Sequence, residues 1–256
     1  MHPSTDNPLS RNILEGFLDL VFPPLCVLCR RRIPAAFASN CFGDKVLCPA
    51  CRRTIILNRP PFCKKCSRPL KDPQASFCKS CERTPLVFDR AWGACLYNDT
   101  MRRLLHLFKY GGKTALRFPF WAIIRDFVAT YDIPVGSFDL IVPVPLHSAR
   151  YRERGFNQAR ILAQMLAVNY RILLEINNLR RVRPTSNQAR LPQKDRWTNI
   201  QSAFKINQPS QYKDKNILII DDLLTTGSTL SETARLLKSA GANEVSALTL
   251  AIAEYY

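Results

Sequence analysis

The chain has 256 residues, a hydrophobic fraction of 46%, a charged fraction of 22% and a formal net charge of +17 at pH 7. This length and composition indicate a globular protein with one full-sized domain and a small one, and they exclude a wholly disordered chain. Because no apolar run approaches the roughly 18 residues of a membrane-spanning helix, we expect no membrane span.

The positive charge is densest in the first third of the chain. Residues 1–85 contain 14 Lys and Arg against 6 Asp and Glu, a net charge of +8, and the longer remainder carries +9. A surplus of this size favours a polyanionic partner such as nucleic acid, because binding releases condensed counterions. A solvated basic surface explains the same composition, so charge alone leaves both interpretations open.

The N-terminal segment contains a short apolar stretch, Ile13 to Phe22, that is interrupted by Glu15, Gly16 and Asp19. It lacks the basic leader and the small-residue cleavage site of a signal peptide. We therefore expect residues 1–22 to form a docking helix on the rest of a cytoplasmic protein.

Eight of the ten cysteines form four Cys-x-x-Cys pairs within residues 23–85, a segment too poor in apolar residues to fold around its own core. Two such pairs supply the four thiolates of a tetrahedral zinc site, which leaves no open position for catalysis. We therefore predict a module with two structural zinc sites over 23–85. The pairs are Cys26/Cys29, Cys48/Cys51, Cys63/Cys66 and Cys78/Cys81.

The sequence leaves the pairing of these motifs open. Pairing in sequence order gives connecting stretches of 18 and 11 residues, and an interleaved arrangement is the other possibility. Disulfides or redox thiols are the alternative to zinc, but a reducing cytosol and four copies of the motif disfavour them. Cys41 and Cys95 lie outside the pairs and are interpreted as small apolar or surface residues.

From about residue 86 onward, apolar patterns typical of strands alternate with patterns typical of helices. Apolar residues three and four positions apart predict amphipathic helices at 101–108 and 159–166, and Gly241 ends a third helix expected over 229–240. The polar segment 183–203 predicts a long loop. This alternation indicates an α/β fold with a parallel sheet over 86–256. The expected strands are 87–97, 138–144, 217–220 and 245–252.

The strand that ends at Ile220 leads directly into the most informative segment of the chain. Asp221 and Asp222 come first, and a hydroxyl-rich loop, Thr225-Thr226-Gly227-Ser228-Thr229, then leads into a helix. Open α/β sheets bind ligands at the carboxyl ends of their strands, and a loop that enters a helix offers backbone N–H groups to a phosphate. An acidic strand end followed by a helix N-cap explains single residues of this string. The whole string is better interpreted as a ribose 5-phosphate site, with the acids on the 2- and 3-hydroxyls.

This string resembles the sequence with which type I phosphoribosyltransferases bind phosphoribosyl diphosphate (PRPP). Two other landmarks of that family occur in the expected order. Residues 141–146, with Val144 and Pro145, are similar to the loop that receives the pyrophosphate, and we expect a helix to follow at Gly155. The polar stretch from Arg183 to Asn199 lies where the family has its mobile lid. The resemblance covers about residues 87–252.

Four Cys-x-x-Cys motifs in front of such a domain, with the strings 108–111, 147–158 and 183–188, resemble the ComF/GntX family of competence-associated factors for DNA uptake. The resemblance implies that Asp221 and Asp222 hold the ribose and that the loop binds the 5-phosphate. It also implies Mg²⁺, which accompanies PRPP and bridges its oxygens. The implied 5-phosphate residues are Thr225, Thr226, Gly227, Ser228 and Thr229, and the pyrophosphate and lid candidates are Val144, Pro145, Arg150, Arg154, Arg183 and Gln188.

Other residues near this site carry weaker predictions. Arg152 joins Arg150 and Arg154 as a possible partner of the pyrophosphate, with an exposed basic helix entry as the alternative for all three. His147 is a candidate general base by position only, and His106 lies off the apolar stripe of its helix.

Three interpretations of the function are open on the sequence. The chain is an active phosphoribosyltransferase with an unidentified acceptor, a PRPP-binding factor in DNA uptake or processing with little turnover, or a zinc-based binder of single-stranded DNA that uses its second domain as a scaffold. The acids and the phosphate loop argue against the scaffold. The zinc module and the charge argue against ordinary nucleotide salvage. The alternative that stays open is a nucleotide-salvage or amidophosphoribosyltransferase-like enzyme whose zinc module is purely structural. We therefore favour a ComF-like factor that binds PRPP and single-stranded DNA, with other DNA-uptake proteins as further candidate partners.

Overall fold

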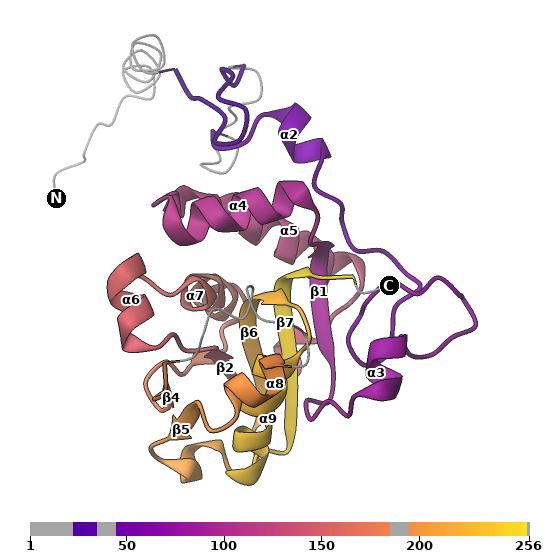
Figure 1. The fold of residues 1–256 in the computed structure, drawn as a ribbon, viewed down its shortest axis with the longest axis vertical. Helices are drawn as coiled ribbons and strands as arrows, with labels where there is room; N and C mark the ends of the chain where they lie inside the picture. The colour runs from indigo at the N-terminus through magenta and orange to yellow at the C-terminus, as the bar shows by residue number, and fades with distance from the viewer. Residues whose placement is uncertain (1–22, 35–44, 185–194, 255–256) are drawn as a thin grey trace, which may run out of the picture. The chain divides into compact units, whose positions relative to one another are not determined.

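The computed structural model describes residues 23–34, 45–184 and 195–254 (Figure 1). The chain divides into two compact units, one up to Thr54 and one from Ile55 onward. The expected docking helix over 1–22 lies outside the described residues, as does Cys41. Among the described helices, none is long and apolar enough to cross a membrane.

Two cysteine ribbons repeat the same local structure. Ribbon 1 contains Cys26, Cys29, Cys48 and Cys51, and ribbon 2 contains Cys63, Cys66, Cys78 and Cys81. In each, the residue after the second cysteine has a left-handed backbone, with φ of 62° at Arg30 and 56° at Ser67. The N–H of this left-handed residue donates a 2.9 Å hydrogen bond to the carbonyl of the first cysteine in each ribbon. The third cysteine precedes a short helix in both cases, α2 (Pro49–Arg53) and α3 (Lys79–Arg83).

The second unit is built on a five-stranded parallel sheet with the strand order β1-β7-β6-β2-β3. The β6 and β7 strands are buried along most of their length, because helices cover both faces of the sheet. This confirms the expected α/β class. The strands are β1 (Ala91–Leu96), β2 (Leu140–Pro143), β3 (Leu173–Leu174), β6 (Asn216–Leu224) and β7 (Glu244–Ile252).

Three helices lie where the sequence predicts them, and two of these carry the predicted apolar stripes. In α4 (Asp99–Tyr110) the four stripe residues Met101, Leu104, Leu105 and Phe108 are all buried. The stripe of α7 (Gln158–Tyr170) is buried as well, and α9 (Ser228–Ser239) packs Leu230, Ala234 and Leu237 onto the sheet face that carries Ile217 and Ile219. Figure 1 shows α9 crossing the lower part of β6 and β7.

Several elements were not expected from the sequence. The α5 helix (Arg117–Thr130) is apolar on most sides and so shows no clear stripe, and α6 (Ser148–Arg154) buries no residue. At Gly155, where a helix was expected to begin, α6 ends instead, with the glycine at φ 78°. The expected loop over 183–203 contains α8 (Asp195–Ile200). Beside it, β4 (Leu179–Arg181) and β5 (Phe204–Ile206) form a separate antiparallel pair. Short 3-10 turns occupy Thr114–Leu116, Val135–Ser137 and Pro209–Tyr212.

Candidate functional site

The cysteine sulfurs of each ribbon converge on one point. Within each group of four, all Sγ atoms lie within 4.8 Å of one another. The Sγ atoms of Cys29 and Cys48 are 3.7 Å apart, and those of Cys66 and Cys78 are 3.6 Å apart. Four thiolates at about 2.3 Å from a tetrahedral zinc ion lie about 3.8 Å from one another, so both groups fit zinc. The motifs therefore pair in sequence order, and no disulfide joins the described cysteines.

Cys95, the described cysteine that lies outside the four pairs, is a core residue. It lies fully buried in β1, and its Sγ donates a hydrogen bond of 3.0 Å to the Leu250 carbonyl. Burial raises the pKa of this thiol well above its usual range, so Cys95 stays protonated and behaves as a small apolar side chain.

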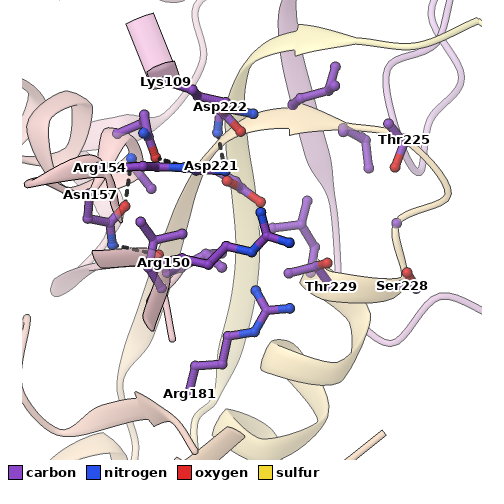
Figure 2. A pocket seen from close by; sticks show the side chains of 18 residues that line it. Lys109, Arg150, Arg154, Asn157, Arg181, Asp221, Asp222, Thr225, Ser228 and Thr229 are labelled. Carbon is purple, nitrogen blue, oxygen red and sulfur yellow. Dashed lines mark hydrogen bonds and ion pairs between the residues drawn. The ribbon is translucent and has the colours of Figure 1, made fainter. Parts of the chain in front are cut away.

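The second unit has a pocket at the carboxyl end of β6. The strand runs on through Asp221 and Asp222 to Leu224, and the loop that follows reaches α9 at Gly227, whose φ of 83° suits glycine. Gly227, Ser228 and Thr229 line the pocket, so the N-terminus of α9 faces it (Figure 2). An anion in this place would meet the backbone N–H groups of the first helical turn and the positive end of the helix dipole.

The two carboxylates of the acid pair lie in different environments. The Asp222 carboxylate is paired with the Lys109 ammonium of α4, with Nζ 2.5 Å from Oδ2. The Asp221 carboxylate accepts a 2.8 Å hydrogen bond from the Asp222 backbone N–H. Burial, followed by the charge of Asp222, raises the pKa of Asp221 to about 7, and the nearby Lys109 charge opposes that rise. A ligand that brings hydroxyl donors or a cation would therefore favour the ionised form of Asp221.

Arginine side chains face these acids across the pocket. Arg150 and Arg154 come from α6, and Arg181 comes from β4 (Figure 2). Burial lowers the pKa of Arg181 to about 10, and the positive charges of Arg150, Arg154 and Arg183 lower it too. This grouping of positive charges in a confined space favours a ligand that carries several negative charges.

Neighbouring side chains hold part of this arrangement in place. The Arg154 guanidinium lies 4.6 Å from the Tyr110 ring centroid and donates a 2.6 Å hydrogen bond to the Tyr110 hydroxyl. Its other terminal nitrogen donates to Gln158 Oε1 at 3.1 Å. Asn157 begins α7 by accepting from the Ala159 N–H at 3.0 Å, and its amide donates to the Val144 carbonyl at 2.9 Å. The loop after β2 is thereby tied to the helix that follows.

The structure brings most of the predicted site residues into this one pocket. Its walls include Asp221, Asp222, Thr225, Gly227, Ser228, Thr229, Val144, Arg150 and Arg154.

The remaining candidates lie elsewhere. Thr226 is a buried residue of the loop, and its hydroxyl lies 3.0 Å from that of Ser228. Arg183 donates to the carbonyls of Asn199 and Gln201 at 2.8 and 2.6 Å. His147 serves as the N-cap of α6, with Nδ1 accepting from the Ala149 N–H at 3.3 Å. Pro145, Arg152, Arg183 and His147 are not among the described residues that line the pocket, and Gln188 lies outside the described residues.

The wall residues without a predicted role include Lys109, Asn157 and Arg181. Lys109 and Asn157 lie in sequence strings that carried the family resemblance. Of the two residues, Asn157 could have been identified from the sequence, because an Asn before an apolar helix stripe is typical of an N-cap. Arg181 lies just before the polar segment and gives no local signal.

Comparisons with known proteins extend this description. Residues 152–254 match the family model described as Phosphoribosyl transferase domain, and residues 17–82 match the one described as Double zinc ribbon domain. The double zinc ribbon match agrees with the two groups of four cysteines, which are the chain's two zinc-binding sites.

Curated proteins resemble larger parts of the chain. Competence protein F of Haemophilus influenzae is 32% identical over 60% of this chain and 69% of its own length. Competence protein ComFC of Bacillus subtilis is 35% identical over 60% of each chain. DNA utilization protein YhgH of Salmonella typhi is 31% identical over 88% of this chain and 96% of its own. Since a likeness of that extent takes in both the ribbons and the sheet domain, the chain belongs to the ComF family.

Proposed function

We propose that the pocket at the carboxyl end of β6 binds PRPP together with Mg²⁺, and that the chain acts with single-stranded DNA in DNA uptake or DNA processing. The observation that carries the PRPP proposal is the arrangement of one pocket. An acid pair and a helix N-terminus form one side, and arginines face them from α6 and β4. PRPP carries the matching groups, which are two vicinal hydroxyls, a 5-phosphate and a pyrophosphate.

Each part of the pocket then has a task. Asp221 and Asp222 accept hydrogen bonds from the ribose hydroxyls, and the loop from Thr225 to Thr229 holds the 5-phosphate with backbone N–H groups and hydroxyls. Arg150 and Arg181, which line the pocket, are the candidates for the pyrophosphate, because Arg154 is already bonded to Tyr110 and Gln158. Asp221 and Asp222 are the carboxylates that would hold Mg²⁺ bound with PRPP, and the ion would supply further positive charge for the pyrophosphate.

The same geometry supports phosphoribosyl transfer as the reaction class when an acceptor is present. The bond between C1 and the pyrophosphate oxygen breaks, and its electron pair leaves with the pyrophosphate, whose growing charge the arginines neutralise. The ribose is left with positive character at C1 until the acceptor forms the new bond. Measuring pyrophosphate release with candidate acceptors tests this step separately from binding.

The DNA part of the proposal rests on the relatives and on the surface of the ribbons. The relatives carry names that refer to competence and to DNA utilization. In ribbon 1 the side chains of Arg30, Arg31 and Arg32 are all exposed, where phosphates can reach them, and Lys64 of ribbon 2 is exposed too. Aromatic side chains near the ribbons could stack on bases, but Phe62 packs against Phe127 and Tyr131, with ring centroids 6.1 and 5.1 Å away. Phe77 is 45% exposed, whereas Phe37 and Phe42 lie outside the described residues.

Calorimetric titration with PRPP and Mg²⁺ tests the PRPP proposal. We expect binding by the parent chain and loss of binding in the double variant Asp221→Asn with Asp222→Asn. The control is Asp99→Asn with Asp126→Asn, which removes the same charge from exposed positions that pair with Arg102 and Arg125. If the first variant binds PRPP as tightly as the control while both remain folded, the pocket assignment is wrong.

A further inference from the structure

A buried arginine of ribbon 2 reaches the phosphate loop. Arg68, two residues after Cys66, is only 3% exposed. One terminal nitrogen of its guanidinium donates to Cys66 Sγ at 3.3 Å, and Nε donates to the Ala253 carbonyl just after β7 at 2.9 Å. The other terminal nitrogen donates to the backbone carbonyl of Thr225, the first residue of the phosphate loop. One planar group thus joins a zinc ligand, the end of a core strand and the loop.

Electrostatics explains why this guanidinium is found in the interior. A buried positive charge is costly unless an opposite charge compensates it. Four thiolates around one zinc ion carry a net charge of about −2, and Arg68 donates directly to one of them. The metal cluster therefore supplies the counter-charge that keeps Arg68 in place. Removing zinc takes away the ion that holds these four sulfurs together beside Arg68, so Arg68 loses the fixed partner that offsets its burial.

The chain that leaves ribbon 2 supports the loop from a second direction. The Leu86 side chain lies next to Gly227, so that a Cβ at Gly227 would come within 3.2 Å of Leu86 Cδ2. The Val87 N–H donates to Ser231 Oγ in the first turn of α9 at 2.9 Å. Ribbon 2 therefore contacts the entry of the loop through Arg68, and the segment that follows the ribbon contacts the exit of the loop into the helix.

Ribbon 1 provides an internal comparison. Arg31 occupies the position in ribbon 1 that Arg68 has in ribbon 2. The Arg31 carbonyl accepts a 2.9 Å hydrogen bond from the Cys26 N–H, and the Arg68 carbonyl accepts a 2.8 Å hydrogen bond from the Cys63 N–H. Arg31 is nevertheless exposed. The zinc knuckle alone therefore does not require a buried arginine at this position, and the burial of Arg68 has to be explained by what it contacts.

We propose that Arg68 is a positioning residue. It is fixed by the metal cluster of ribbon 2 and holds the phosphate loop in its binding conformation. Zinc in ribbon 2 thereby sets the affinity of the pocket for a sugar 5-phosphate. The affinity part of this proposal rests on the proposed function, whereas the positioning of the loop does not. In this arrangement the second zinc site acts on ligand binding without touching the ligand.

The experiment uses the full chain as Arg68→Met, Arg68→Lys and, as the matched control, Arg31→Met. Elemental analysis counts zinc, hydrogen exchange without ligand follows the backbone amides of residues 225–229, and calorimetry measures the affinity for ribose 5-phosphate. We expect Arg68→Met to retain two zinc ions, to exchange the loop amides at least about tenfold faster and to bind about tenfold more weakly, as the loss of one charge-assisted hydrogen bond implies. Arg68→Lys should fall between this variant and the parent, and Arg31→Met should match the parent.

A spectroscopic signature separates positioning from general stability. With cobalt(II) in place of zinc, ribose 5-phosphate should shift the thiolate absorption band in the parent and in Arg31→Met but not in Arg68→Met, because Arg68 is the link between the loop and Cys66.

Unchanged loop exchange in an Arg68→Met variant that retains both zinc ions would overturn the proposal. If that variant loses zinc from ribbon 2, the same exchange measurement is made on the parent chain at increasing chelator concentrations. Loop amides that exchange faster as zinc leaves residues 63–81 support the proposal, and loop amides that stay protected after zinc has left contradict it. A parent chain that does not bind ribose 5-phosphate would refute the proposed function, while the exchange data would still test the role of Arg68.

Discussion

Replacing Lys109 with methionine tests how the acid pair of the pocket is ionised. The Lys109 ammonium lies 2.5 Å from Asp222 Oδ2, and the lysine side chain is 22% exposed. The pKa of Asp221 is raised to about 7 by burial and by the charge of Asp222, and the ammonium opposes this rise. In Lys109→Met, the pKa of Asp221 should therefore increase further.

The size of this increase can be worked out approximately. A unit charge about 5 Å from a carboxylate contributes roughly 3 kcal/mol at an effective dielectric constant of about 20. Screening by solvent at the partly exposed lysine reduces this to about 1.4 kcal/mol, or about one pKa unit. At pH 7, about half of Asp221 is then ionised in the parent and about a tenth in the variant. If only the carboxylate binds the ribose hydroxyls, PRPP affinity falls about fivefold at pH 7, and the difference narrows towards pH 9, where both proteins have an ionised Asp221.

Calorimetric titration with PRPP and Mg²⁺ between pH 6 and pH 9 measures this effect. Lys113→Met is the control, because it removes the same charge from an exposed position just after α4. Titration of the phosphates of PRPP affects all three proteins equally and cancels in the comparison. An affinity loss of the same size at every pH would refute the reasoning, since it would mean that Lys109 contacts the ligand directly rather than controlling Asp221.

Three further results are expected. Protein purified under reducing conditions should contain two zinc ions per chain, and elemental analysis that finds well under one would contradict both sites. Cys66→Ser should lower the thermal unfolding temperature of the sheet domain more than Cys29→Ser does, because Cys66 is fully buried in that domain's core whereas Cys29 is exposed in ribbon 1. Equal effects of the two variants in calorimetric scans would argue against this. The logarithm of the affinity for labelled single-stranded DNA should fall with the logarithm of the salt concentration, by about 0.7 per phosphate contacted. The variant Arg30/Arg31/Arg32→Ala should bind more weakly and flatten this slope, and an unchanged affinity would place the DNA site elsewhere.

Local sequence patterns predicted much of the sheet domain. The continuous apolar run Ile217–Ile220 identified a buried strand, and the periodic stripe from Met101 to Phe108 identified a helix. The zinc ligands were predictable for a related reason, because each Cys-x-x-Cys pair is a local turn that carries half of a site. The acid pair and the loop up to Thr229 were recognisable because strand, ligand residues and helix follow one another without a break.

The opposite wall of the pocket could not be predicted in this way. Lys109 lies more than one hundred residues before Asp222, and Arg181 approaches Asp221 from a two-stranded sheet that the sequence did not indicate. Such contacts depend on how helices and loops pack, which periodicity does not encode. The α5 helix was missed for the opposite reason, since it is apolar on most sides and leaves no polar face to mark its period.

Ribbon 2 shows how a module that is evident in the sequence can belong physically to its neighbour. The cysteine motifs suggested a boundary near residue 85, whereas the compact unit begins at Ile55. Cys63 and Cys66 are fully buried in the same core as Phe88, Ala91 and Leu230, because a ribbon without a core of its own is stabilised by burying its apolar side against the sheet domain. A fragment that begins at residue 86 would therefore lose part of the core, together with Arg68 and its contact to the loop. A fragment that begins at Ile55 retains both, so it is the appropriate one for separating the ligand chemistry of the pocket from the charge of ribbon 1.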